Sequence, residues 1–336
     1  MNDMTDTSSI DAVAASLMES PEVEAPEDEI VEASDEDEAD EQSEADDDTT
    51  EDNADDVEDD EEQGEESVAA DAGFDHRPNV LLILADDLGY SDVRSYGSEI
   101  STPNLDQLAN NGLRFSSFYT TASCAPTRAM LLTGVDSHRA GVANISEALT
   151  PEQAHSPFYR GTLNHNVITI ATLLKDAGYN TAMSGKWHLG YADPSLLPIN
   201  RGFKQTVTMP FSGGDNWTQQ SYVPHYDKTL WLENGKEISV PEGFYSSKFI
   251  VDKAIQQLDN NQKTHEGKRK PFFSYVSFQA VHIPLQAPEE FTEKYIGSYR
   301  EGWHALRKKR QNAVKDLGLI PASAPMKRMA TTDDWD

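Results

Sequence analysis

The sequence predicts an α/β domain with a mostly parallel central sheet flanked by helices, and three observations support this prediction. Val80–Ala85 is a continuous apolar run, which is the pattern of a strand covered on both faces. Asn180–Ser184 and Phe272–Phe278 are two further strand-like segments, and the amphipathic segments Ile168–Ala177 and Ser246–Asp259 are typical of helices. An alternation of strands and helices favours a parallel sheet with helices packed on its faces.

The remaining elements are predicted from local signals. A cap residue, a proline and a following glycine predict a short helix over Ser101–Ala109. Leu113–Tyr119 has the composition of a second strand. A helix is expected to start at Cys124 and to include Ala129–Thr133. Residues 190–245 are rich in Gly, Pro, Asn and aromatic residues, so we predict long irregular loops there.

The net negative charge of the sequence comes from one segment. Residues 1–76 contain 33 of the 59 Asp and Glu residues and no Lys or Arg, which leaves 26 acidic against 27 basic residues from Arg77 onward. A segment so charged and so poor in apolar residues cannot offset the entropy lost on folding. We therefore predict a disordered acidic tail over residues 1–76, serving as a spacer or as an interaction segment, and one folded domain over residues 77–336.

The sequence also bears on location and on some classes of partner. No basic and apolar leader follows Met1, and no stretch approaches the roughly 18–20 apolar residues that cross a bilayer. The single cysteine, Cys124, excludes an intramolecular disulfide. We expect a cytoplasmic protein that binds neither a membrane nor a nucleic acid.

Charged side chains follow three of the predicted strands. Asp86-Asp87 comes directly after the first apolar run, Lys186-Trp187-His188 follows the strand at Asn180–Ser184, and His282 follows Phe272–Phe278. Ligands of open α/β sheets bind at the carboxyl ends of the strands. Two adjacent carboxylates repel each other, and a divalent cation relieves that repulsion. Asp86 and Asp87 are therefore either a metal site or a strand-ending turn.

The segment around Cys124 carries the strongest signal. A lone cysteine is commonly a small buried hydrophobic residue, but Cys124 opens a predicted helix, and Arg128 lies one turn further on. Free amides at a helix start attract anions, and a thiol in such a place can become a thiolate nucleophile.

Two motifs in this region resemble the signatures of the sulfatase family. Cys124–Arg128, followed by Leu131-Leu132-Thr133-Gly134, resembles the first signature, and Gly178–His188 resembles the second. Arg77–Val80 together with Asp86–Tyr90 resembles the usual opening of the family, and Gly243–Ser247 and Val281–Pro288 resemble segments of the bacterial arylsulfatases that act on aryl and some alkyl sulfates. The resemblance implies an alkaline-phosphatase-like fold and a sulfuric ester hydrolase that cleaves sulfate monoesters.

The resemblance further implies a chemical role for each motif residue. Cys124 would be converted by a formylglycine-generating maturation enzyme to formylglycine, whose hydrate attacks sulfur. Asp86, Asp87 and the modified Cys124 would bind one divalent cation, expected to be Ca²⁺. The resemblance gives the other site residues these roles: Arg128 would position the formylglycine, Lys186 would hold a sulfate oxygen, His188 would deprotonate the hydrate, and His282 would act on the leaving oxygen.

The sequence departs from the family in one important respect. Sulfatases of this kind place two more metal ligands in a Ser-Asp-Asn-Gly segment after a later strand, and no such segment follows His282. Asp215-Asn216 has the right residue types but precedes that strand, so we reject it as the missing pair. We therefore expect an incomplete N-terminal portion of a sulfatase, inactive by itself. The alternatives are a phosphonate or phosphate monoester hydrolase of the same superfamily, and a non-catalytic fragment that acts only by binding.

Overall fold

A six-stranded sheet forms the centre of the fold, as seen in a computed structural model that describes residues 77–153, 155–224, 226–263 and 270–326. Its strand order is β1-β6-β2-β3-β4-β5. The strands are β1 (Val80–Leu84), β2 (Asn180–Lys186), β3 (Gln205–Met209), β4 (Trp231–Glu233), β5 (Lys236–Ile238) and β6 (Phe272–Ser277). The first four in spatial order run parallel, and β4 and β5 are antiparallel to their neighbours. The mostly parallel α/β sheet predicted from the sequence is confirmed.

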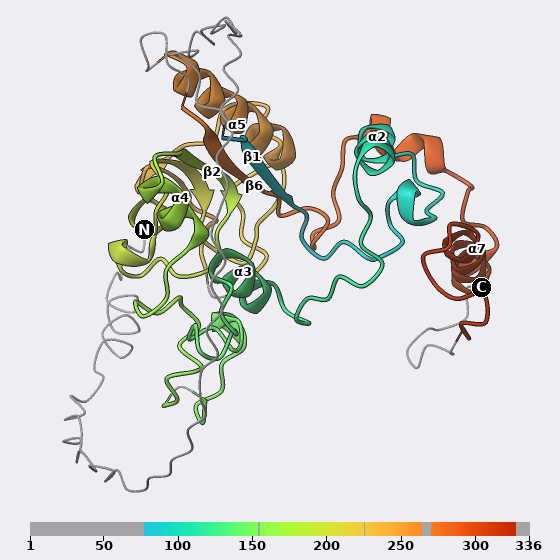
Figure 1. The fold of residues 1–336 in the computed structure, drawn as a ribbon, viewed down its shortest axis with the longest axis horizontal. Coiled ribbons are helices and arrows are strands. Elements are labelled where there is room, and N and C mark those ends of the chain that lie inside the picture. Colours follow the sequence, from blue (N-terminus) through green and yellow to red (C-terminus); the bar gives the residue numbers. More distant parts are fainter. Residues whose placement is uncertain (1–76, 154, 225, 264–269, 327–336) are drawn as a thin grey trace, which may run out of the picture. The chain divides into compact units, whose positions relative to one another are not determined.

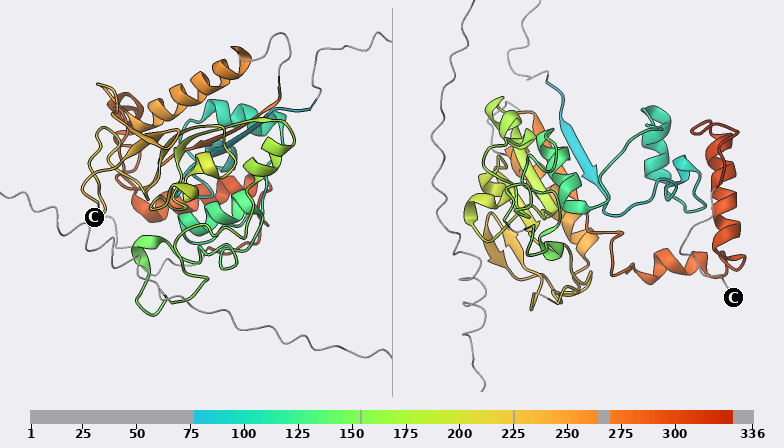
Figure 2. Two further views of the ribbon diagram at one scale, coloured as in Figure 1. Left: turned by 90° about the vertical axis from the view of Figure 1, so that its left-hand side faces the viewer. Right: turned by 90° about the horizontal axis from the view of Figure 1, so that it is seen from below.

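Helices cover both faces of this sheet (Figures 1 and 2). The principal helices are α2 (Pro103–Asn111), α3 (Cys124–Thr133), α4 (Ile170–Asp176), α5 (Ser246–Lys263), α6 (Glu289–Thr292) and α7 (Gly302–Asp316), and of these α3, α4 and α5 pack against the sheet. One core packs α3 and α4 against β1, β2 and β6, and the other packs α5 against β3, β4 and β6. None of the helices in these ranges combines the length and the apolar character that crossing a bilayer requires.

The helices form close to where local signals predict them. α4 begins at Thr169, whose hydroxyl accepts a hydrogen bond from the Thr172 backbone N–H, and this cap satisfies a free amide of the first turn. α3 starts at Cys124 as predicted and ends at Gly134, which has a left-handed φ of 67°. The acidic segment predicted to be disordered, residues 1–76, lies outside the described residues.

The strand predicted over Leu113–Tyr119 does not form. Leu113, Phe115, Phe118 and Tyr119 are 85%, 64%, 66% and 88% exposed. A strand is stable only when its backbone groups pair with a neighbour, and within the described residues no strand pairs with this segment. The prediction used composition alone, which does not show whether a segment has a neighbouring strand to pair with, and it was wrong.

Two further predictions about the sheet need correction. β1 is an edge strand covered on one face only, because α5 packs over β2, β6 and β3, and Leu81 and Ile83 remain 53% and 49% exposed. The loops predicted over residues 190–245 contain β3, β4 and β5. These strands are short, and β3 alternates threonines with apolar residues, so no apolar run marks them.

Gly185 allows β2 and β6 to approach closely at the end of the sheet nearest the site. Its φ is +111°, and a Cβ at this position would lie 1.8 Å from the carbonyl oxygen of Ser277. Any side chain would therefore push the two strands apart. Lys186, which pairs with Asp86, is the next residue of β2.

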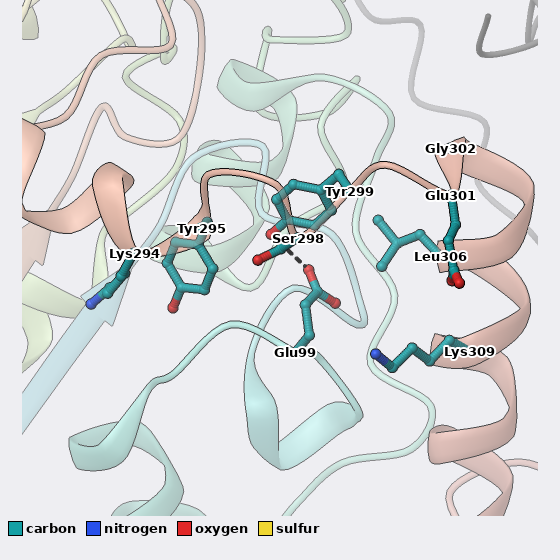
Figure 3. A pocket seen from close by; sticks show the side chains of 9 residues that line it. All are labelled: Glu99, Lys294, Tyr295, Ser298, Tyr299, Glu301, Gly302, Leu306 and Lys309. Carbon is teal, nitrogen blue, oxygen red and sulfur yellow. Dashed lines mark hydrogen bonds between the residues drawn. The ribbon is translucent and has the colours of Figure 1, made fainter.

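An ionic clamp joins α7 to the segment around the short helix Arg94–Tyr96. Arg310 donates to Glu99 at 2.8 Å and to Asp92 at 2.5 Å, and Tyr299 donates its hydroxyl to Glu99 at 3.0 Å. Figure 3 shows Glu99 and Tyr299 facing each other in this region. The hydrogen bond from Arg310 outweighs partial burial and lowers the pKa of Glu99 to about 2.

We predict that Arg310→Met lowers the free energy of unfolding by about 1 kcal/mol near neutral pH, because the charge-assisted bonds are partly solvent-screened. Since Glu99 has a lowered pKa in the folded state, its contribution is present above its unfolded pKa of about 4.3 and is lost as pH falls toward the folded value. Urea unfolding at several pH values should thus show the two proteins converging in acid. Lys308→Met, an exposed position on the same helix, is the control. An equal loss in both variants would contradict the clamp.

Candidate active site

The predicted site residues meet at the carboxyl ends of the parallel strands. A cavity of about 150 Å³ is lined by Asp86, Asp87, Cys124 and Arg128, together with neighbouring residues of the same segments. The other three predicted residues contact this group: Lys186 contacts Asp86, His188 contacts Cys124, and His282 contacts Asp87. The structure therefore brings together seven residues that are spread over nearly two hundred positions of the chain.

Beside the cavity lies a buried cluster of one carboxylate and two cations. Lys186 Nζ lies 2.5 Å from Asp86 Oδ2, and an Arg128 guanidinium nitrogen lies 3.3 Å from Asp86 Oδ1. The three side chains are 0%, 1% and 4% exposed for Lys186, Arg128 and Asp86. Burial would raise the pKa of Asp86, but the charges of Lys186 and Arg128 outweigh it and lower that pKa. The cluster keeps one positive charge in excess, which favours an anionic ligand.

Arg128 is held in place by the sheet. Its Nη1 donates to the Lys186 carbonyl at 3.0 Å and to the Ser277 hydroxyl at 2.5 Å. Its Nε is buried and has no hydrogen-bond partner within the described residues. A buried donor of this kind is costly unless a ligand satisfies it, so the unpaired Nε also favours an anion next to the cavity.

Cys124 is paired with His188 at the start of α3. Its Sγ lies 3.2 Å from His188 Nδ1, and His188 Nε2 lies 3.2 Å from Glu147 Oε2. Burial would raise the pKa of the Cys124 thiol, but the hydrogen bond with His188 and the charge of Lys186 lower it below its usual value. If Cys124 becomes formylglycine, the sulfur atom marks the place of one of the two hydrate oxygens.

The backbone is strained at two of these residues. Asp87 and His188 have φ angles of 57° and 56°, in the left-handed region that residues other than glycine seldom adopt. Such residues cost energy and are concentrated at functional sites. Asp87 lies just after β1 and His188 just after β2, and both side chains lie at the candidate site.

His282 lies beside Asp87. Its Nε2 is 3.5 Å from Asp87 Oδ2, its Nδ1 donates to the Ile283 carbonyl at 2.8 Å, and the Tyr222 hydroxyl lies 3.4 Å from Nδ1. Burial is the main cause that raises the pKa of Tyr222 to about 12. Tyr222 therefore keeps its proton at neutral pH.

Sequence reasoning missed three polar residues of this region, Glu147, Tyr222 and Tyr226. Glu147 lies in a one-turn helix, Ser146–Ala148, and both tyrosines lie in the long loop region. No motif or periodicity marks them. Only their contacts with His188 and His282, or with each other, reveal them.

The dipeptide Asp215-Asn216 has structural contacts. The Asn216 amide oxygen accepts hydrogen bonds from Ser246 and Gln279, and Asp215 accepts one from Gln286. Asn216 is 2% exposed. These bonds tie the loop after β3 to the segment that carries His282.

The described residues do not supply a complete metal site. Within them, no group of three or more His, Cys, Asp and Glu side chains is placed to hold a metal ion. Asp86 and Asp87 line the same cavity, but both Asp86 oxygens face cationic side chains. Calcium takes about 6–8 oxygen ligands, and two carboxylates fall well short of that number.

We predict that the 336-residue chain binds calcium only weakly. Titration calorimetry should detect no site in the micromolar range, because most of the ligand shell must come from water. Asp87→Asn, which removes one of the two carboxylates that line the cavity, should weaken any residual heat signal further. Micromolar binding would show that other residues of this chain complete the shell.

The fold and the site together define a class: an α/β domain with a cation-rich anion site at the carboxyl ends of its parallel strands. The chain belongs to the sulfatase family, whose model, described as Sulfatase, matches residues 78–324. The alkaline-phosphatase-like fold expected from the sequence agrees with this family membership and with the mostly parallel sheet.

Curated relatives extend this similarity. The chain is 41% identical to an uncharacterised sulfatase of Schizosaccharomyces pombe over 77% of its length, and 36% identical to an arylsulfatase of Klebsiella aerogenes over 80%. These matches cover 48% and 56% of the two relatives, so the chain spans about half the length of the curated relatives it matches.

Among solved structures, the chain resembles Ps i-CgsB in complex with k-i-k-neocarrahexaose, with a TM-score of 0.55 and 30% identity. That match covers 71% of this chain and 54% of the other. A second structure, solved with its substrate D-glucosamine-2-N,6-O-disulfate, has a TM-score of 0.50 and 29% identity, over 66% of this chain and 38% of the other.

Proposed function

We propose that this chain carries the nucleophile-bearing part of a sulfuric ester hydrolase that acts on sulfate monoesters. The observation that carries the proposal is the buried Lys186–Asp86–Arg128 cluster, with its excess positive charge, beside the Cys124–His188 pair. A sulfate monoester is a compact anion that matches such a site. The similarity to arylsulfatases, including that of Klebsiella aerogenes, supports an aryl sulfate as the substrate that we propose for this chain.

The nucleophile in this proposal is formylglycine, made from Cys124 by a maturation enzyme that recognises the Cys124–Arg128 segment. When hydrated, formylglycine supplies a hydroxyl that attacks sulfur and a second hydroxyl through which sulfate is later released. Lys186 binds a sulfate oxygen as a compact point charge. Arg128, anchored by the Lys186 carbonyl and Ser277, holds residue 124 in place and offsets negative charge.

In this proposal each of two histidines carries out one proton transfer. His188 is 3.2 Å from residue 124 and takes a proton from it, which places a general base at the nucleophile. His282, beside Asp87 and Tyr222, lies where it can give a proton to the leaving oxygen. Asp86 and Asp87 are the carboxylates that the chain offers to a divalent cation, for which we propose calcium. Because the described residues do not fit a complete metal site, we derive no step through the ion.

Mass spectrometry of the peptide containing Cys124, after co-production with a formylglycine-generating enzyme, tests the proposal. We expect conversion of Cys124, with hydrolysis of an aryl sulfate at or barely above the background rate, because the metal shell is incomplete. The same preparation is assayed with aryl phosphonate and aryl phosphate esters. A preference for either of these would replace the sulfatase assignment with a phosphonate or phosphate hydrolase. Neither conversion nor hydrolysis would favour a chain that acts only by binding.

A further inference from the structure

The carboxylate of Glu147 lies directly behind His188. Its Oε2 is 3.2 Å from His188 Nε2, on the side of the ring opposite Cys124. The two side chains are 10% and 5% exposed. Glu147 is separated from His188 by 41 residues of chain, so the contact is created by the fold and not by local sequence.

The hydrogen bond fixes which ring nitrogen carries the proton. Burial would raise the pKa of Glu147, but its interaction with His188 outweighs burial and lowers that pKa to about 2. An ionised carboxylate can only accept hydrogen bonds, so Nε2 must be the donor. A neutral imidazole has a single ring proton, and the lone pair of Nδ1 therefore faces residue 124.

Tyr226 holds the other oxygen of the same carboxylate. Its hydroxyl donates to Glu147 Oε1 at 3.1 Å. Its ring packs on Phe211, with centroids 4.3 Å apart, and on Tyr191 at 6.1 Å. Burial, followed by the negative charge of Glu147, raises the pKa of the Tyr226 phenol, so it remains a donor. The aromatic cluster thus anchors the carboxylate behind the histidine.

We propose that Glu147 is a positioning residue that sets the tautomer and orientation of His188, so that Nδ1 receives the proton from residue 124, and that Tyr226 holds Glu147 for this task. The inference rests on the proposed function for the reaction that it serves. Its first test does not, since the tautomer can be measured without any turnover. A carboxylate behind a histidine is effective when it selects the tautomer that leaves the reacting nitrogen free.

The first test measures the tautomer by proton–nitrogen NMR correlations of the imidazole rings at about pH 8, where histidines are mostly neutral. It uses the Cys124→Ser variant of the full chain, whose hydroxyl stands in for a hydroxyl of the hydrate and does not form an ion pair with histidine. The His188 signal is identified by its loss in Cys124→Ser/His188→Asn. We expect the proton on Nε2. A proton on Nδ1, with Glu147 intact, would overturn the inference.

Substitution of Glu147 then shows whether it causes this preference. Glu147→Leu removes the acceptor and should shift the tautomer ratio toward Nδ1–H by about tenfold or more. Glu147→Gln keeps a carbonyl acceptor and should retain the wild-type tautomer. Glu152→Leu, an exposed glutamate of the same loop, is the matched control. An unchanged ratio in a folded Glu147→Leu protein would overturn the inference. If that variant does not fold, Tyr226→Phe must still broaden or shift the His188 signals, and unchanged signals would count against it.

The second test compares kinetic constants in formylglycine-containing protein. Glu147→Leu should lower kcat by about 10–100-fold while KM stays within about twofold, and Glu147→Gln should recover part of the loss. A rise in KM with unchanged kcat would identify Glu147 as a substrate-binding or structural residue instead. Failure of the maturation enzyme to convert Cys124 would contradict the proposed function, while the tautomer measurement, which uses unconverted protein, would still decide the role of Glu147.

Discussion

Replacing Cys124 with alanine should remove any sulfate ester hydrolysis that a matured form of this protein shows, a loss of at least about a thousandfold. In the proposed mechanism residue 124 supplies the atom that attacks sulfur. The other nucleophilic groups that line its cavity are the hydroxyls of Thr120, Thr121, Ser123 and Thr127 and the carboxylates of Asp86 and Asp87, and none of them can form a hydrate. The fold should be unaffected, because Cys124 is a small residue in the first turn of α3. Aryl sulfate turnover and labelling with an aldehyde-reactive probe are the two measurements.

A matched control separates this effect from damage to α3. Met130→Leu changes a partly exposed side chain of the same helix, 37% exposed, and should leave both labelling and turnover as they were. Hydrolysis that persists in Cys124→Ala above a few per cent of the parent rate would eliminate the formylglycine mechanism.

Asp86→Ala should cost about 3–5 kcal/mol of unfolding free energy, because it leaves the buried cations Lys186 and Arg128 without their counter-ion. The same link predicts a pH effect. The pKa of Asp86 is lowered in the folded state, so its stabilising contribution is present above the unfolded value of about 3.9 and disappears as pH falls through the lower, folded pKa. The parent and the variant should therefore approach each other in stability in strong acid.

Asp87→Ala provides the comparison for this experiment. Its side chain is 57% exposed and forms a single ion pair within the described residues, with His282 at 3.5 Å, so its loss should change stability by no more than about 0.5 kcal/mol. Urea denaturation of the three proteins gives the values. Similar losses at both positions would mean that the Lys186–Asp86–Arg128 cluster contributes no more than a surface ion pair.

The strands and helices nearest the site were predictable because their signals are local. The apolar run of β1, the cap at Thr169 and the glycine after α3 each act through residues a few positions apart. Leu113–Tyr119 failed as a strand because composition cannot supply a pairing partner. β3 was not predicted, because its buried residues include Thr206 and Thr208, which are not apolar. Pairing with β2 and β4 makes this segment a strand.

The sequence by itself determined the identity of the motif residues and the order in which strands place them. Asp86, Lys186 and His282 were expected at one edge of the sheet because parallel strands end there together. Only the tertiary structure decided which of them touch. The Lys186–Asp86 contact spans 100 residues and the His188–Glu147 contact spans 41. Hydrogen-bond partners of buried charges depend on distances of a few ångströms in space, and no spacing along the chain encodes them.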